Sequence, residues 1–178
     1  PEEIEQQKQY CREIKKLFEG RPGGPPLAYT QTFGCQQNEA DSERIRGYLE
    51  EMGYGFTDDE EQAQIIVINT CAIREHAEQR VFGNVGALVH VKRRHPEQII
   101  CLCGCMAQRP QVAEKIRQSY RHVDLVFGPH ALWKFPEMIH TLLLHRGRIF
   151  EVNDEAGSIA EGIPLMRQDS VKAWVSIM

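Results

Sequence analysis

The stretch Ile65–Phe82 most constrains the fold, because an apolar β-branched run stops at a cysteine and apolar residues then recur at helical spacing. A short Ile/Val run bounded by polar residues is typical of a strand buried on both faces. Cys71 lies at the turn after this run. The apolar positions that follow at helical spacing are Ala77, Val81, Val85 and Leu88. The stretch therefore predicts a buried strand, a turn and a helix that packs on a sheet.

The same order of strand, cysteine and helix occurs twice more. The strand-like run Leu27–Phe33 leads to Cys35, and the run Gln98–Cys103 leads to Cys105. In open α/β sheets, ligands bind in the crevice outside the carboxyl ends of the strands, where loops and helix N-termini converge. We therefore expect the three thiols of Cys35, Cys71 and Cys105 to meet at one edge of the sheet.

Alternating strands and helices indicate an α/β fold with right-handed crossovers. We predict an open, mainly parallel sheet of about five strands with helices on both faces, of the Rossmann or flavodoxin-like type, and an N-terminal accessory helix. The strands are predicted at 27–33, 65–70, 98–103, 124–128 and 148–152. The helices are predicted at 2–19, 40–52, 108–120 and 131–145 and after Cys71. We divide the chain into a helix with a Pro/Gly linker (1–26), an α/β domain (27–152) and a connector that ends in a strand-like segment (153–178).

Composition restricts the class of protein. No apolar run in the 178 residues approaches the ~18 that a membrane span needs, and the N-terminus is acidic where a signal peptide would be basic. We expect a cytoplasmic protein without a membrane partner. The net charge of −4 lacks the basic excess of a domain that grips nucleic acid by phosphates alone. The basic cluster Lys92–His95 is interpreted as the solvated end of a helix.

Six cysteines in a cytosolic chain favour metal or cluster chemistry over disulfides, which are rare in that compartment. Cys35, Cys71 and Cys105 each precede a predicted helix, whose N-terminal partial positive charge favours the thiolate. Three thiolates suit an iron–sulfur cluster with one iron left open. Structural zinc takes four protein ligands and usually shows Cys-x-x-Cys pairs, which this sequence lacks.

Alternatives remain for the other candidate ligands. Cys101 and Cys103 alternate with Cys105 along a strand and could place three sulfurs on one face, although their apolar run favours a packing role. Cys11 is also expected to pack. The sequence has no phosphate-binding loop and no nucleophile elbow. Three histidines share one predicted helix but face different ways, which does not predict a metal site: His76, His90 and His95.

Four motifs carry a resemblance to a known family: Thr32–Glu43, Asn69–Gly83, Cys103–Gln108 and Val126–His130. In this order they resemble the N-terminal domain of the tRNA methylthiotransferases, a radical S-adenosylmethionine family, and most closely its MiaB-type branch. The resemblance covers roughly residues 27–178.

The resemblance implies that Cys35, Cys71 and Cys105 hold an auxiliary [4Fe-4S] cluster. The resemblance also implies that this cluster supplies the sulfur for methylthiolation of carbon 2 of an isopentenylated adenosine beside the tRNA anticodon. It further implies a second [4Fe-4S] cluster, on a Cys-x-x-x-Cys-x-x-Cys triad in a barrel domain, that cleaves S-adenosylmethionine, and a C-terminal RNA-binding domain. That triad is absent from these 178 residues, so residues 153–178 are expected to lead into the barrel. The polypeptide as given is expected to bind the auxiliary cluster as a monomer and to be inactive alone, with tRNA bound by the full-length enzyme.

Four side chains flank Cys71 and are candidates to tune such a cluster through hydrogen bonds or charge: Asn69, Thr70, Arg74 and Glu75. Local capping of the following helix is an alternative role for them. Two other functions remain open at this point. One is a flavodoxin-like cofactor-binding or electron-transfer module, and the other is a structural domain with reduced, buried thiols.

Overall fold

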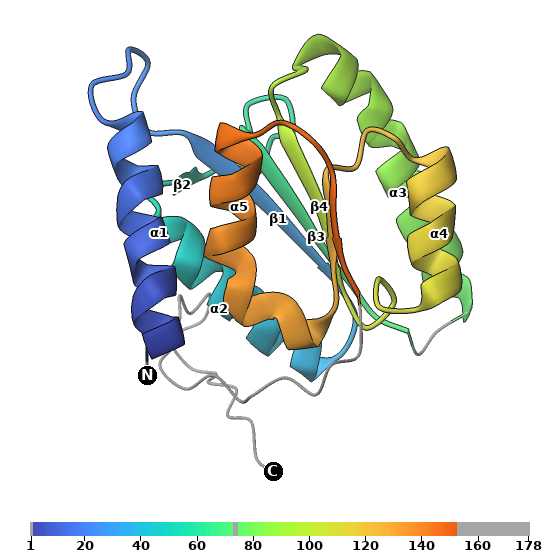
Figure 1. Cartoon of the computed structure of the whole chain (residues 1–178). Helices are drawn as coiled ribbons and strands as arrows, with labels where there is room; N and C mark the ends of the chain where they lie inside the picture. The colour runs from blue at the N-terminus through green and yellow to red at the C-terminus, as the bar shows by residue number, and fades with distance from the viewer. Residues whose placement is uncertain (1, 73–74, 153–178) are drawn as a thin grey trace.

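The computed structural model describes residues 2–72 and 75–152, which form one parallel six-stranded sheet with the order β2-β1-β3-β4-β5-β6 (Figure 1). The strands are β1 (Leu27–Phe33), β2 (Gly55–Phe56), β3 (Ile65–Thr70), β4 (Ile99–Gly104), β5 (Leu125–Phe127) and β6 (Ile149–Glu151). The helices are α1 (Glu2–Phe18), α2 (Gln36–Glu51), α3 (Glu75–Arg94), α4 (Pro110–Ser119), the 3-10 helix η1 (Pro129–Lys134) and α5 (Phe135–Leu144). The predicted α/β class is confirmed.

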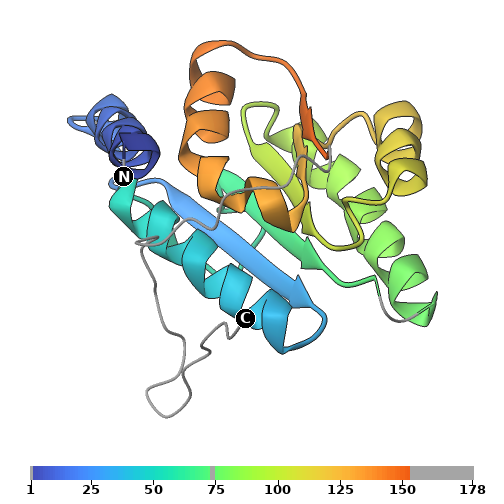
Figure 2. The same ribbon diagram turned by 60° about the horizontal axis from the view of Figure 1, so that its bottom comes forward.

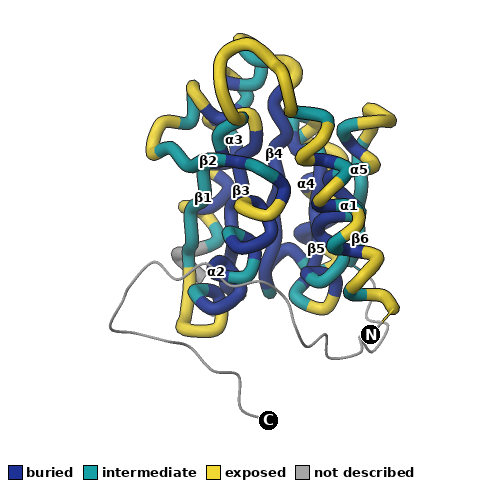
Figure 3. The backbone as a smooth tube through the Cα atoms, turned by 90° about the vertical axis from the view of Figure 1, so that its left-hand side faces the viewer, coloured by how far each residue is buried: buried dark blue, intermediate teal, exposed yellow. Residues whose placement is uncertain are grey.

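Helices cover both faces of the sheet, as predicted. Helices α1, α2 and α5 lie on one face and α3 and α4 on the other (Figures 1 and 2). Successive residues of β3 alternate between the two cores: Val67 packs with the first group of helices, and Ile66 and Ile68 with the second. Every residue of β3 and β4 is buried (Figure 3).

The chain changes direction across the sheet between β1 and β3. Helix α2 carries the chain from β1 outward to β2, and α3 carries it on the other face from β3 to β4. Such a reversal of strand order is the topological switch point at which open α/β sheets bind ligands. The final residues of the three strands are in register, Phe33 beside Thr70 and Thr70 beside Gly104. Three cysteine-bearing turns therefore leave one edge of the sheet side by side.

The N-terminal helix α1 belongs to the first core, which lies between the sheet and helices α1, α2 and α5. Cys11 and Ile14 of α1 are buried there, and burial raises the pKa of the Cys11 thiol to about 12. Gln7 accepts a hydrogen bond from the backbone N–H of Glu137 in α5 at 3.1 Å. The packing role expected for Cys11 agrees with this position. The division of the chain at residue 26 stays a prediction.

Three details differ from the sequence-based expectations. The sheet has a sixth strand, β2, whose two residues carry no recognisable pattern. Helix α2 starts at Gln36 rather than near residue 40, because Cys35 is its N-cap. The helix predicted over 131–145 begins as a 3-10 turn, and α5 starts at Phe135, since Pro136 suits a first turn but not a helix interior. The predicted connector and strand at 153–178 lie outside the described residues. Within the described part of the chain, no helix has both the length and the apolar character to cross a membrane.

Candidate metal centre

The turns after β1, β3 and β4 bring Cys35, Cys71 and Cys105 to the same edge of the sheet. The three thiols lie close enough to interact electrostatically. Burial raises the pKa of the Cys105 thiol, and the neighbouring Cys71, Asp41 and Cys35 raise it further. Their gathering matches the sequence-based expectation, while their role as metal ligands stays a prediction.

Three cysteine sulfurs are the ligand type of an iron–sulfur cluster. Among residues 2–72 and 75–152, no group of three or more His, Cys, Asp or Glu side chains is arranged to hold one metal ion. Each cysteine of a [4Fe-4S] cluster binds a different iron, so its ligands lie farther apart than the ligands of a single ion. Cys35 is exposed, Cys105 is partly buried and Cys71 is buried, so a ligand can approach from the Cys35 side.

Cys35 has the environment of a thiolate. Its pKa is lowered, first by the backbone N–H of Asn38, and also by the backbone N–H of Gln37 and the Cys71 thiol, against a smaller opposing effect of burial. These amides belong to the first turn of α2, whose unpaired N–H groups and dipole favour negative charge. The lowered pKa agrees with the expectation that a helix N-terminus favours the thiolate form of Cys35.

The same expectation is wrong for Cys105. Helix α4 begins only at Pro110, so its first turn is five residues along the chain from this thiol. Burial and neighbouring negative groups dominate instead, and they raise the pKa of Cys105. Cluster binding at this position would have to displace the thiol proton without help from a helix dipole.

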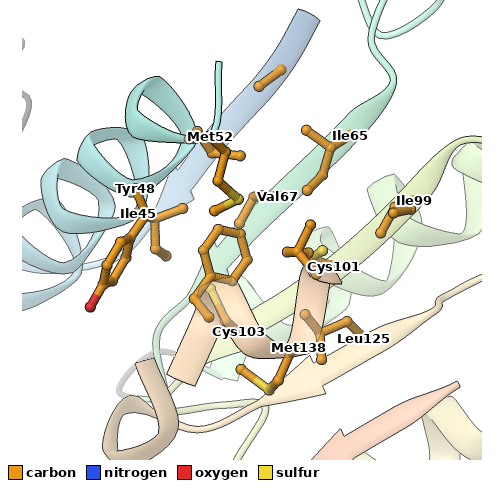
Figure 4. Close-up of a cluster of buried hydrophobic side chains, with 14 of the residues drawn as sticks. Ile45, Tyr48, Met52, Ile65, Val67, Ile99, Cys101, Cys103, Leu125 and Met138 are labelled. Carbon is orange, nitrogen blue, oxygen red and sulfur yellow. The ribbon is translucent and has the colours of Figure 1, made fainter. Parts of the chain in front are cut away.

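Cys101 and Cys103 are buried core residues. Both side chains pack under the helices of the first core, among Val67 and Met138 (Figure 4). Burial raises the pKa of both thiols well above the ordinary value. Gly104 ends the strand with φ +97°, so Cys105 does not continue the strand's alternation of side chains. These positions favour the packing role over the local triad of sulfurs.

A buried polar network links the cysteine-bearing turns. The Asn38 side chain accepts from the backbone N–H of Cys35 at 3.2 Å and donates to the Thr70 carbonyl at 2.9 Å. Asn69 exchanges hydrogen bonds with Asn38, and the Thr70 hydroxyl donates to the Cys103 carbonyl at 2.6 Å. Of the four predicted flanking side chains, Asn69 and Thr70 thus belong to this network. Arg74 lies outside the described residues, and nothing is described of the Glu75 side chain.

Sequence reasoning missed Asn38 and Arg109. The spacing Cys35-x-x-Asn38 is that of a capping box and could have identified this pair. Arg109 follows the third cysteine turn, and its Nη2 donates to the Ala72 carbonyl at 2.9 Å. No local sequence pattern predicts the contact between Arg109 and Ala72, because these residues are 37 positions apart in the chain.

The basic cluster 92–95 lies at the C-terminal end of α3, which is the end away from the cysteine turns. Lys92 pairs with Asp124 at 2.8 Å, and His95 contacts Glu61 at 3.2 Å. Arg94 also pairs with Glu61. Arg93 and Arg94 are exposed, as expected for a solvated helix end, whereas Lys92 is partly buried against Asp124.

Comparison with known proteins identifies the family. Residues 28–128 match the profile of a family described as Uncharacterized protein family UPF0004. The chain belongs to this family. The matched segment of this UPF0004 chain begins in β1, ends just after β5 and contains all three cysteine turns.

Curated relatives of this UPF0004 chain carry a functional name. It is 44% identical over 181 residues to a tRNA-2-methylthio-N(6)-dimethylallyladenosine synthase of Acetivibrio thermocellus, a match that covers 100% of this chain and 38% of the relative. Synthases of the same name from Alkaliphilus oremlandii and Clostridioides difficile are 44% and 43% identical, with 37% and 38% of the relative covered. The resemblance to the tRNA methylthiotransferases is confirmed. The chain spans little more than a third of the length of these relatives.

Proposed function

We propose that this chain is the auxiliary-cluster domain of a tRNA-2-methylthio-N(6)-dimethylallyladenosine synthase, in which Cys35, Cys71 and Cys105 hold a [4Fe-4S] cluster. The observation that carries the proposal is the register of β1, β3 and β4, which sets three thiols at one sheet edge beside the switch point. The names of the relatives support the same assignment.

When held by the three cysteine thiolates, such a cluster would supply the sulfur that is transferred. The residues of the chain have distinct tasks. Cys35, exposed and at a helix N-terminus, is prepared to ligate as a thiolate. Cys71, which is buried, and Cys105, which is partly buried, provide the other two sulfur ligands. Gly34 allows the turn of Cys35 to approach β3, because a Cβ there would lie 2.7 Å from the Cβ of Cys71.

The parent protein is proposed to be a radical S-adenosylmethionine transferase that acts on tRNA. Substitution at carbon 2 of an isopentenylated adenosine breaks a strong aromatic C–H bond, which needs cofactor radical chemistry rather than a protein side chain. A second [4Fe-4S] cluster and S-adenosylmethionine, in a barrel domain in cis, would supply it. We expect the parent to bind the tRNA anticodon stem-loop as a cytoplasmic monomer, and residues 1–178 alone to be inactive.

Anaerobic reconstitution with iron and sulfide tests the proposal. We expect about four irons per chain, and a loss of bound iron when Cys35, Cys71 or Cys105 is replaced by serine. The matched control is Cys11→Ala, which removes a buried thiol from α1 and should leave the iron content unchanged. A flavodoxin-like module uses the same switch point. Flavin absorption without iron would favour that alternative, and unchanged iron content in all three serine variants would contradict the cluster assignment.

A further inference from the structure

We propose that Asn38 is a positioning residue that fixes the separation of the Cys35 and Cys71 thiols. The inference rests on the proposed function in that these two thiols are taken as ligands of one cluster. It is carried by the contacts of the Asn38 side-chain amide. Asn38 is 1% exposed and joins the two cysteine-bearing turns.

The oxygen of this amide holds the Cys35 turn. Oδ1 of Asn38 accepts from the backbone N–H of Cys35 at 3.2 Å and from its thiol Sγ at 3.3 Å. Both the main chain and the side chain of Cys35 are therefore held by one residue.

The nitrogen of the same amide holds β3. Nδ2 of Asn38 donates to the carbonyl oxygen of Thr70 at 2.9 Å and to Oδ1 of Asn69 at 3.0 Å. The Thr70 carbonyl belongs to the peptide unit that leads directly into Cys71. Asn69 returns a bond from its Nδ2 to the backbone carbonyl of Asn38 at 2.8 Å. Every hydrogen-bonding group of the Asn38 amide is used, half on Cys35 and half on the strand that ends at Cys71.

Two glycines leave space for this arrangement. A Cβ at Gly34 would lie 2.3 Å from Oδ1 of Asn38, and a Cβ at Gly104 would lie 2.5 Å from Oδ1 of Asn69. Real Cβ atoms do not approach other atoms so closely, so any side chain at either position would displace an amide. The absence of a side chain at Gly34 and at Gly104 thus leaves room for the paired amides of Asn38 and Asn69.

Helix capping alone does not account for these contacts. Asn38 is the N3 residue of α2, and the capping box needs from its side chain only an acceptor for the backbone N–H of the N-cap Cys35. Asparagine adds two donors, and both reach β3 rather than α2. Asn38→Ser keeps a capping oxygen and is neutral, but it loses both donors. It therefore separates positioning from capping.

The experiment cross-links the metal-free chain with dibromobimane, a short reagent that joins two thiols, and quantifies the Cys35–Cys71 link by peptide mapping. Yields are normalised to the rate at which iodoacetamide modifies Cys35, so that reactivity is not mistaken for distance. We expect Asn38→Ser to lower the normalised yield by about fivefold or more, because loss of the two donors to β3 frees the turn. The control Ser42→Ala removes another partner of Asn69, at 2.9 Å, and should stay within about twofold of the original chain.

The rate at which a chelator removes iron from the reconstituted chain is the second readout, and we expect it to rise by about fivefold in Asn38→Ser. If Asn38→Ser does not fold, as judged by circular dichroism, Asn38→Asp gives the same comparison with an isosteric side chain. A folded variant that cross-links like the original chain overturns the inference, whatever its iron content. An original chain that takes up no iron overturns the proposed function, and a fall in cross-linking would then still support the positioning role.

Discussion

The side chain of Arg109 donates from Nη2 to the backbone carbonyl oxygen of Ala72 at 2.9 Å, which ties the turn after Cys105 to the loop after Cys71. Its other terminal nitrogen lies 3.7 Å from a carboxylate oxygen of Glu78 at the start of α3. Arg109 is also the N-cap of α4. One partly exposed side chain thus spans the second and third cysteine turns, as Asn38 spans the first and second.

Arg109→Gln should loosen the Cys71 loop. Removing a charge-assisted hydrogen bond at a partly exposed site is expected to lower the free energy of unfolding by about 1 kcal/mol and to speed iron loss from the reconstituted chain several-fold, by about the same energy. Urea unfolding and chelator stripping measure the two effects. Arg121→Gln, an exposed arginine past the end of α4, is the matched control and should change neither quantity. Equal effects of the two substitutions would show that Arg109 acts only as a surface charge.

Gly104→Ala should be strongly destabilising. Gly104 has φ +97°, and a Cβ there would lie 2.2 Å from the carbonyl oxygen of Thr70. Left-handed backbone strain together with this overlap is expected to lower the free energy of unfolding by at least about 2 kcal/mol. Gly83→Ala is the control, since Gly83 lies in α3 with nothing within 4 Å of its Cβ position, and should stabilise by roughly 0.5–1 kcal/mol. A stable Gly104→Ala chain would contradict the packing of β3 against the end of β4.

Alkylation of the metal-free chain should follow a fixed order. Cys35 is exposed and its pKa is lowered, so at pH 7 it holds a larger thiolate fraction than an ordinary cysteine. Cys101 and Cys103 are buried with raised pKa values. Iodoacetamide is expected to modify Cys35 at least about tenfold faster than either of them. Peptide mapping over time measures the order, and early modification of Cys101 would show that β4 opens readily.

The pH dependence of stability should contain a contribution from Asp41. Burial raises the pKa of this carboxyl, although a hydrogen bond from Gln37 and the charge of Arg44 oppose the shift. A carboxyl whose pKa is higher in the folded than in the unfolded chain stabilises the fold below the unfolded pKa, near about 4, and this stabilisation is lost as pH rises through the folded value. Asp41→Asn should remove that fall in urea unfolding experiments on the metal-free chain. The exposed control Asp58→Asn should keep it, and an unchanged profile in Asp41→Asn would refute the assignment.

Much of the scaffold could be predicted from sequence, because a buried parallel strand is a continuous apolar run that a short stretch of sequence reveals. The run Ile65–Thr70 is buried at all six residues, as a continuous apolar strand should be. The helix 40–52 was also predicted from its apolar spacing. Ile45 and Leu49 recur at helical spacing in α2, and both are buried. The sequence could not reveal β2, because two residues contain no periodicity.

The sequence predicted where the three thiols lie but not which side chains surround them. Recurring cysteines at strand ends placed the three thiols, because parallel strands share a carboxyl edge. Asn38 and Asp41 follow Cys35 in a helix whose polar residues would ordinarily face water, yet both are buried. Their partners lie on other strands and turns, and long-range hydrogen bonds leave no local pattern. The opposite pKa shifts of Cys35 and Cys105 likewise depend on the fold, because the backbone N–H of Asn38 lowers the pKa of Cys35 and burial raises that of Cys105.

The central claim is that Cys35, Cys71 and Cys105 hold one iron–sulfur cluster between three adjacent strand ends. Mössbauer spectroscopy of the chain reconstituted with 57Fe tests it most directly, because it counts the kinds of iron site in the sample. The account predicts that nearly all bound iron has the signature of a [4Fe-4S] cluster, and that this signature vanishes when all three cysteines become serine. Iron that is mononuclear, or a cluster that persists in the triple serine variant, would contradict it.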